Sequence, residues 1–300
     1  MIFFRETNRI LGSLRWIDKG AIWILDLENH IERRCEVPGA QFVSLKAGKA
    51  GHFLVVHHMS ESTAASVRHV GSPDQELASL QFRDGAAQFH GRSELWWQVE
   101  TAILQVFRRG YRLFVVDPIG PKATHLDLSW YTAESYDLSY QGLVDCMTLP
   151  DDRRVVVSVQ RSSDLVILDK ESNRFVETAR LPGSSGNPEL AVRSRADFLA
   201  SDYDTLARVD AKTFRILSSA RLQDAGSFIG HYHLWSECLC AVARPFGSDV
   251  ILVDPMDFRI VGRTMLGGQP LSVCMISETQ VIARDWKSGA VSAGTFQPSD

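Results

Sequence analysis

The sequence predicts an all-β fold, a single seven-bladed β-propeller in which four-stranded antiparallel blades surround a central channel. Two observations carry this prediction. One phrase of strand, aspartate, turn and strand recurs along the chain, and long amphipathic helix patterns are absent. A period of roughly 40 to 45 residues is typical of propeller blades. The 300 residues therefore divide into about seven repeats.

The recurring phrase is an apolar alternating run that ends in Asp, followed by a polar turn and a second run. Two clear copies are DLVILDKESNRFVETARL and DVILVDPMDFRIVGRTML. An Asp at the start of a turn can accept hydrogen bonds from the backbone N–H groups of that turn. We therefore interpret these aspartates as architectural rather than catalytic. They are Asp26, Asp117, Asp169, Asp210 and Asp254.

Two further strand-like runs precede each phrase, which gives four short strands per repeat. Residues 1–6 either supply the fourth strand of the last blade, and so close the ring, or form the inner strand of the first blade. Closure is attractive because an unpaired strand edge invites aggregation. We expect one domain over residues 1–300. Its expected blades span 1–38, 39–83, 84–130, 131–182, 183–223, 224–267 and 268–300.

The stretch LPDDRRVVVSVQRSSDLVILDKESNRFV, residues 149–176, resembles the YVTN-type repeat of seven-bladed β-propellers. The resemblance is clearest over residues 143–266, and Gln160 stands where the motif has Asn. Proteins of this class include sugar-lactone hydrolases, lyases and binding modules. The resemblance therefore implies a fold and no single function.

Composition and charge exclude several classes of function. A net charge of -4 gives the whole chain no attraction to nucleic acid or to an anionic membrane, so neither is an expected partner. Arg5 and Glu6 interrupt the first apolar stretch, unlike the core of a secretory signal. No apolar run approaches the roughly 18 residues that cross a bilayer. Five cysteines without CxxC spacing favour a reducing compartment. We expect a cytoplasmic protein without a cofactor.

The ends of the second strands in the seven expected blades align on charged residues. Five are Arg, one is His and one is Asp. A ring of guanidinium groups would suit a phosphate, sulfate or carboxylate, because Arg binds such anions bidentately. Alternatively, neighbouring aspartates such as Asp164 and Asp249 hold the arginines in local ion pairs. The aligned residues are Arg15, His57, Arg108, Arg161, Asp202, Arg244 and Arg284.

Aromatic residues form the second candidate site. Trp286 follows Arg284 in the same loop, and the segment SWYTAESYDLSYQ, residues 129–141, carries Trp130 and Tyr131. Trp and Tyr suit sugar stacking or contact with a protein partner. The alternative is that the segment only covers irregular blades.

His231 and His233 alternate in GHYHLWSE and form the third candidate. A His-x-His pair can bind zinc, but further ligands would have to come from other blades. No second cluster at metal-ligand spacing is present, so we predict no metal site and keep the two histidines as weak candidates.

These patterns favour a non-catalytic binding or scaffolding propeller with an Arg-lined face for an anionic small molecule or an acidic protein partner. The alternative is a propeller enzyme of the lactone hydrolase or lyase type that acts on a small anionic metabolite. In that case His231, His233 or His57 would act as acid or base. Nucleophile-elbow, Walker and dinucleotide-binding motifs are absent from the sequence.

Overall fold

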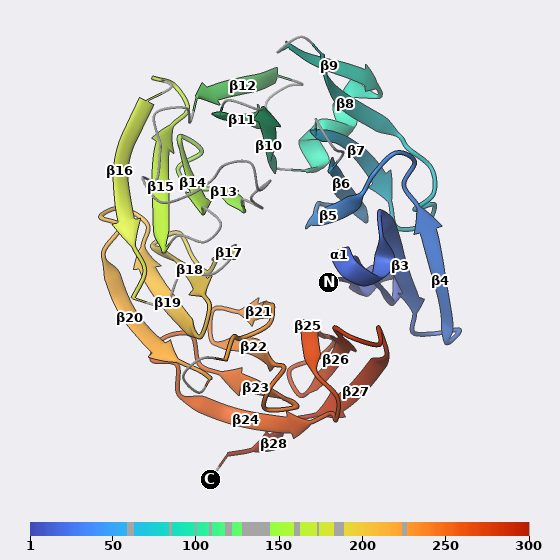
Figure 1. Ribbon diagram of the computed structural model, residues 1–300, viewed down its shortest axis with the longest axis vertical. Coiled ribbons are helices and arrows are strands. Elements are labelled where there is room, and N and C mark those ends of the chain that lie inside the picture. The colour runs from blue at the N-terminus through green and yellow to red at the C-terminus, as the bar shows by residue number, and fades with distance from the viewer. Residues whose placement is uncertain are drawn as a thin grey trace. The chain divides into compact units, whose positions relative to one another are not determined.

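The protein is an all-β chain in the computed structural model (Figure 1). It divides into two compact units. Unit 1 contains residues Met1–Gln141 and Lys170–Arg174, and unit 2 contains Gly142–Asp169 and Phe175–Asp300. The structure describes residues 1–58, 63–83, 86–99, 101–107, 110–117, 122–127, 145–158, 163–172, 174–182, 189–223 and 227–299.

Unit 1 contains three antiparallel sheets. The first consists of β1 (Ile2–Phe4), β2 (Arg9–Gly12), β3 (Ala21–Asp26) and β4 (Ile31–Glu36). The second consists of β5 (Phe42–Ala47), β6 (His52–His58), β7 (Thr63–His69), β8 (Ala78–Arg83) and β9 (Ala86–Gly91). The third consists of β10 (Thr101–Phe107), β11 (Gly110–Asp117) and β12 (Lys122–Asp127). The short helices are η1 (Arg5–Thr7), α1 (Arg15–Asp18) and η2 (Ser93–Gln98).

Unit 2 contains four antiparallel sheets. The first consists of β13 (Cys146–Thr148), β14 (Arg154–Ser158), β15 (Asp164–Asp169) and β16 (Arg174–Arg180). The second consists of β17 (Leu190–Val192), β18 (Asp197–Asp202), β19 (Thr205–Asp210) and β20 (Ile216–Arg221). The third consists of β21 (Tyr232–Ser236), β22 (Leu239–Arg244), β23 (Asp249–Val253), β24 (Ile260–Met265) and β28 (Gln297–Pro298). The fourth consists of β25 (Pro270–Met275), β26 (Gln280–Asp285) and β27 (Val291–Thr295).

The prediction of seven blades with four strands each is wrong. Six blades are defined by described side chains that pack into hydrophobic cores, and their strand numbers range from three to five. The sheet β10–β12 lies outside that set because its side chains are not among those described. The uniform number of four strands fails because β9 extends the sheet β5–β8, β28 extends the sheet β21–β24, and β25–β27 has three strands among the described residues.

The N-terminal strand does not supply the fourth strand of the last blade, and the C-terminal strand does not join the last sheet either. β1 pairs with β2, so residues 2–4 form the first strand of the first sheet. β28 pairs with β24 through Gln297 and Pro298. Among the described residues the sheet β25–β27 therefore has three strands. The second of the two alternatives for residues 1–6, the inner strand of the first blade, is the one observed.

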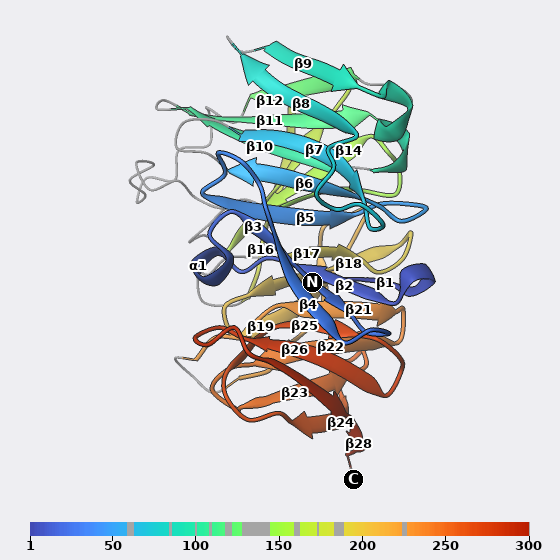
Figure 2. The same ribbon diagram turned by 90° about the vertical axis from the view of Figure 1, so that its right-hand side faces the viewer.

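A continuous apolar run gives β14 two buried faces. In unit 2, Val155, Val156 and Val157 of β14 are fully buried, because both faces of a blade pack against other side chains. Figure 2 shows β25 beside β21 and β22, which it contacts directly. No helix in the described part of the chain has the length and apolar content that spanning a membrane requires.

The turn-forming role is confirmed for Asp26, Asp210 and Asp254. Asp210 Oδ1 accepts the backbone N–H groups of Lys212 and Thr213, at 2.9 and 2.6 Å. Asp26 caps the turn after β3 through Asn29, and Asp254 caps the turn after β23 through Met256. The backbone hydrogen bond from Thr213 lowers the pKa of Asp210, since it stabilises the carboxylate form.

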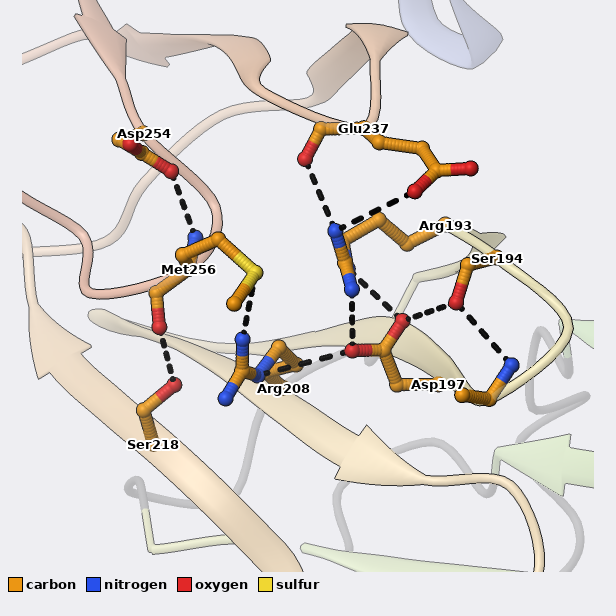
Figure 3. Close-up of polar contacts among 9 residues, drawn as sticks. Arg193, Ser194, Asp197, Arg208, Ser218, Glu237, Asp254 and Met256 are labelled. Atoms are coloured by element: carbon orange, nitrogen blue, oxygen red, sulfur yellow. Dashed lines mark hydrogen bonds and ion pairs between the residues drawn. The ribbon is translucent and has the colours of Figure 1, made fainter.

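An ion-pair network joins the second and third sheets of unit 2 at the edge where β18 begins (Figure 3). Asp197 is buried and accepts two hydrogen bonds from Arg193, at 2.7 and 2.6 Å. Arg193 also donates to the backbone oxygen of Glu237, at 3.0 Å, across the sheet boundary. Arg208 lies 3.6 Å from Asp197 and donates to the sulfur of Met256 in the third sheet. These contacts fix the two sheets to each other.

Candidate functional site

The structure describes part of the expected arginine ring. Arg15 lies in α1, and its side chain is outside the described set. Asp202 is buried at the end of β18. Four of the predicted site residues lie outside the described residues, so their positions stay predictions. They are Arg108, Trp130, Tyr131 and Arg161.

His57 and Arg284 lie inside their sheets. His57 Nε2 is 2.8 Å from the hydroxyl oxygen of Ser66, and the ring is buried. Burial, with a smaller contribution from the charge of Arg68, lowers the pKa of His57 to about 4. The imidazole is therefore neutral at pH 7. Arg284 is 4% exposed, and its Nε donates to the backbone oxygen of Gly289 at 3.2 Å.

Arg244 closes the base of the turn between β22 and β23. Its Nε and Nη2 donate to the two carboxylate oxygens of Asp249, at 2.9 and 2.5 Å, which is the bidentate geometry that Arg favours. Its Nη1 donates to the backbone oxygen of Leu222 in the neighbouring sheet. Asp249 is fully buried and also pairs with Arg263 of β24. Two guanidinium groups thus share one carboxylate and leave a net positive charge.

This clamped turn presents an exposed aromatic ring. Phe246 stands between Arg244 and Asp249 and is 53% exposed. Gly247 permits the close approach of the carboxylate, because a Cβ at that position would lie 2.6 Å from Asp249 Oδ1. The ion pair of Arg244 with Asp249 therefore joins the two ends of the turn that carries Phe246.

Phe246 is the outer member of an aromatic patch formed by Tyr203, Phe228, Phe246 and Trp286. The ring of Phe228 meets Phe246 edge-on at 5.3 Å between centroids, and it meets Trp286 edge-on at 6.0 Å. Tyr203 lies 6.2 Å from Phe228. Edge-to-face pairs of this kind are favourable beyond their buried area. The patch draws residues from the second, third and fourth sheets of unit 2.

A cation accompanies the patch at Trp286. The Nζ of Lys287 lies 5.6 Å from the centroid of the indole ring, within cation–π range. The indole Nε1 donates to Gln269 Oε1 at 2.6 Å, which fixes the ring. Asp285 accepts the backbone N–H groups of Lys287 and Ser288 and is occupied by the turn.

The two candidate histidines have different partners. His231, just before β21, pairs through Nδ1 with Glu189, which precedes β17. His233 Nδ1 accepts the backbone N–H of Met275 at 3.1 Å. Tyr232 donates its hydroxyl to the backbone oxygen of Glu189, and burial raises the pKa of Tyr232 well above its ordinary value. Among the described residues, no group of three or more His, Cys, Asp or Glu side chains could hold a metal ion.

The sequence singles out Arg244 and Trp286 as candidate site residues and Asp249 as an ion-pair partner, but it does not single out the other rings of the aromatic patch. The segment RPFGSD at residues 244–249 carried a signal, since an aromatic residue at the tip of a strand-to-strand turn has little core to enter. Phe228 lies in a link between blades, and no sequence spacing relates it to Phe246. Only the fold brings them together.

Comparison with known proteins supports the fold and leaves the function open. No protein-family model matches the sequence, and no curated protein matches it. Among solved structures, the chain is similar to the Cps50 (Swd1) β-propeller domain of Myceliophteria thermophila. The TM-score is 0.68 at 12% identity, over 99% of this chain and 96% of that one.

The chain is also similar to a putative 6-phosphogluconolactonase from Bacteroides fragilis, with a TM-score of 0.61 at 9% identity. That match covers 97% of this chain and 92% of the other. At these identities the similarity establishes the fold alone, because propellers host unrelated functions. The protein is an all-β β-propeller.

Proposed function

We propose that this protein is a non-catalytic binding propeller that docks an acidic segment of a protein partner on the aromatic patch of unit 2. The observation that carries the proposal is Phe246, a half-exposed ring on a turn clamped by Arg244 and Asp249. Rigid aromatic anchors are typical of the residues that dominate protein interfaces, since ordering them on binding costs little entropy.

The charges beside the patch favour an acidic partner over a neutral one. Asp249 is shared by Arg244 and Arg263, so that cluster carries a net positive charge. Lys287 adds a second cation over Trp286. The guanidinium of Arg244 already holds a carboxylate of this chain, which favours a broad contact with a protein over capture of a small anion.

The test uses four labelled peptides of equal length. The first has an apolar residue flanked by Asp and Glu. The second has Ser in place of the apolar residue, the third has Ser in place of the acids, and the fourth has Lys in place of the acids. We expect the first to bind best and its affinity to fall as salt rises, because charge contributes to the contact. Equal binding of all four peptides would contradict the proposal.

A second candidate function is favoured by one observation, the pairing of His231 with Glu189. A carboxylate at Nδ1 fixes the tautomer and orients Nε2 as a base, as in hydrolytic dyads. The similarity to a putative 6-phosphogluconolactonase makes sugar lactones the substrates to test. If this candidate holds, His231→Gln abolishes turnover of a lactone panel and His90→Gln leaves it unchanged. If the wild-type protein hydrolyses none of the lactones, the second candidate function is contradicted.

A further inference from the structure

Among the described residues, the fourth sheet of unit 2 ends in a strand, β27, that is paired along one edge only. The other three sheets of unit 2 place a fourth strand beyond the third, namely β16, β20 and β24. In the described part of the fourth sheet, β27 is outermost (Figure 1). An outermost strand exposes backbone groups that can pair with another chain.

The register identifies which backbone groups point outward. Asp285 N–H donates to the oxygen of Ala290, and Phe296 N–H donates to that of Thr279. Hydrogen-bonded and non-hydrogen-bonded pairs alternate in an antiparallel ladder. With Ile282 opposite Ala293, the residues whose N–H and C=O groups point away from β26 are therefore Val291, Ala293 and Thr295.

The edge of β27 lacks the features that normally block pairing. Outer strands are commonly protected by charged residues or Pro. In unit 2, the outermost strand β16 contains Arg174, Glu177 and Arg180, the outermost strand β20 contains Arg221, and β28, the outermost strand of the third sheet, contains Pro298. The sequence of β27 is VSAGT, with no charge and no Pro. Ala293 and Thr295 are exposed.

We propose that β27 is an interface between two copies of this chain, paired antiparallel about Ala293. This register places Val291 of each copy opposite Thr295 of the other, a pairing of two β-branched residues that suits adjacent strands. Ala293 faces its own copy, and no like charges meet across the twofold axis. The contact is small and buries little area, so it gives a weak, concentration-dependent dimer. It is independent of the aromatic patch.

Disulfide trapping tests the register. In a Cys238→Ser background, which removes the exposed native thiol, Ala293→Cys and Thr295→Cys are oxidised separately. At the dimer axis two Ala293 Cα atoms would lie about 5.5 Å apart, within the range that a disulfide spans. Two Thr295 Cα atoms would lie about 14 Å apart, from four residues at the usual rise of a strand. Cross-linking of Ala293→Cys at least about tenfold faster than Thr295→Cys is expected, and equal rates would overturn the register.

Sedimentation velocity over a range of concentrations tests the dimer itself. Ala293→Lys is expected to weaken association by about tenfold or more, because like charges would face each other across the axis. Leu217→Lys, on exposed strand β20, should leave association unchanged, and circular dichroism verifies that both variants fold. Wild-type protein that stays monomeric throughout overturns the proposal. Phe246→Ala should still dimerise, so loss of peptide binding and loss of the dimer are separable.

Discussion

Phe246 and its clamp illustrate how single residues build the candidate site. The ion pair with Asp249 occupies the Nε and Nη2 donors of Arg244. It fixes the ends of a short turn, and the ring of Phe246 between them is half-exposed. In the proposed function, the buried carboxylate of Asp249 would act on binding by fixing the position of the neighbouring aromatic ring.

The clamp predicts a large effect of Asp249→Asn on stability. Asp249 is fully buried and bonded to two arginines, whose side chains are 17% and 52% exposed. Removing its charge leaves both cations without a carboxylate partner, although their partial exposure keeps some hydration. We expect the free energy of unfolding to fall by about 2–3 kcal/mol. Urea unfolding measures this, and Asp74→Asn, at an exposed position, should change it by less than about 0.5 kcal/mol.

His57 predicts a defined pH dependence of stability. Its pKa of about 4 in the folded protein lies below the usual value near 6.5 in the unfolded chain. The unfolded state therefore takes up a proton first, and stability is lost as pH falls from about 6.5 towards 4. His57→Gln should flatten this part of the profile, by at most about 1.4 kcal/mol per pH unit. A profile that is unchanged by the substitution would contradict the burial of a neutral imidazole.

At the scale of elements, the repeated hairpin is the unit that the sequence predicts best. The Asp that ends one strand caps the following turn, and the residue four positions later adopts a left-handed conformation. Phe214 and Phe258 do so at φ of 56° and 60°. These are local interactions within five residues, so a sequence pattern can report them.

The hairpin predicts how acid affects stability through Asp210. Its pKa is lowered by the backbone N–H of Thr213, so the stability that it contributes is present above the unfolded pKa near 3.9 and is lost as pH falls through the folded pKa. Asp210→Asn keeps a side-chain oxygen for the turn but cannot titrate. We expect the wild type to be more stable than this variant at pH 7 and the difference to shrink at pH 2. Urea midpoints at both pH values measure it.

Features that depend on packing between sheets could not be predicted from the sequence. The predicted number of blades was wrong. The uniform number of strands was also wrong, because β28 joins the third sheet of unit 2 through a pairing that no sequence repeat reports. The sequence does not show whether Arg244 is ion-paired. In the structure its Nε and Nη2 donate to the two carboxylate oxygens of Asp249. Phe228 and Phe246 meet only because their sheets are neighbours.

For the whole molecule, the propeller fold limits the function very little. Two of the solved structures that resemble this chain carry unrelated names. Their sequences are 12% and 9% identical to it. What distinguishes this chain is which side chains its turns present. In unit 2 those turns present an aromatic patch flanked by cations. The central claim is that this patch is a docking surface for an acidic protein segment.

The most direct measurement is the affinity of the acidic peptide with a central apolar residue for three forms of the protein. They are the wild type, Phe246→Ala and Leu217→Ala, the last a control that removes a comparably exposed apolar side chain from β20. The account predicts that Phe246→Ala weakens binding by about tenfold or more, equivalent to at least about 1.4 kcal/mol, and that Leu217→Ala leaves it unchanged. Equal affinities for all three forms would contradict it.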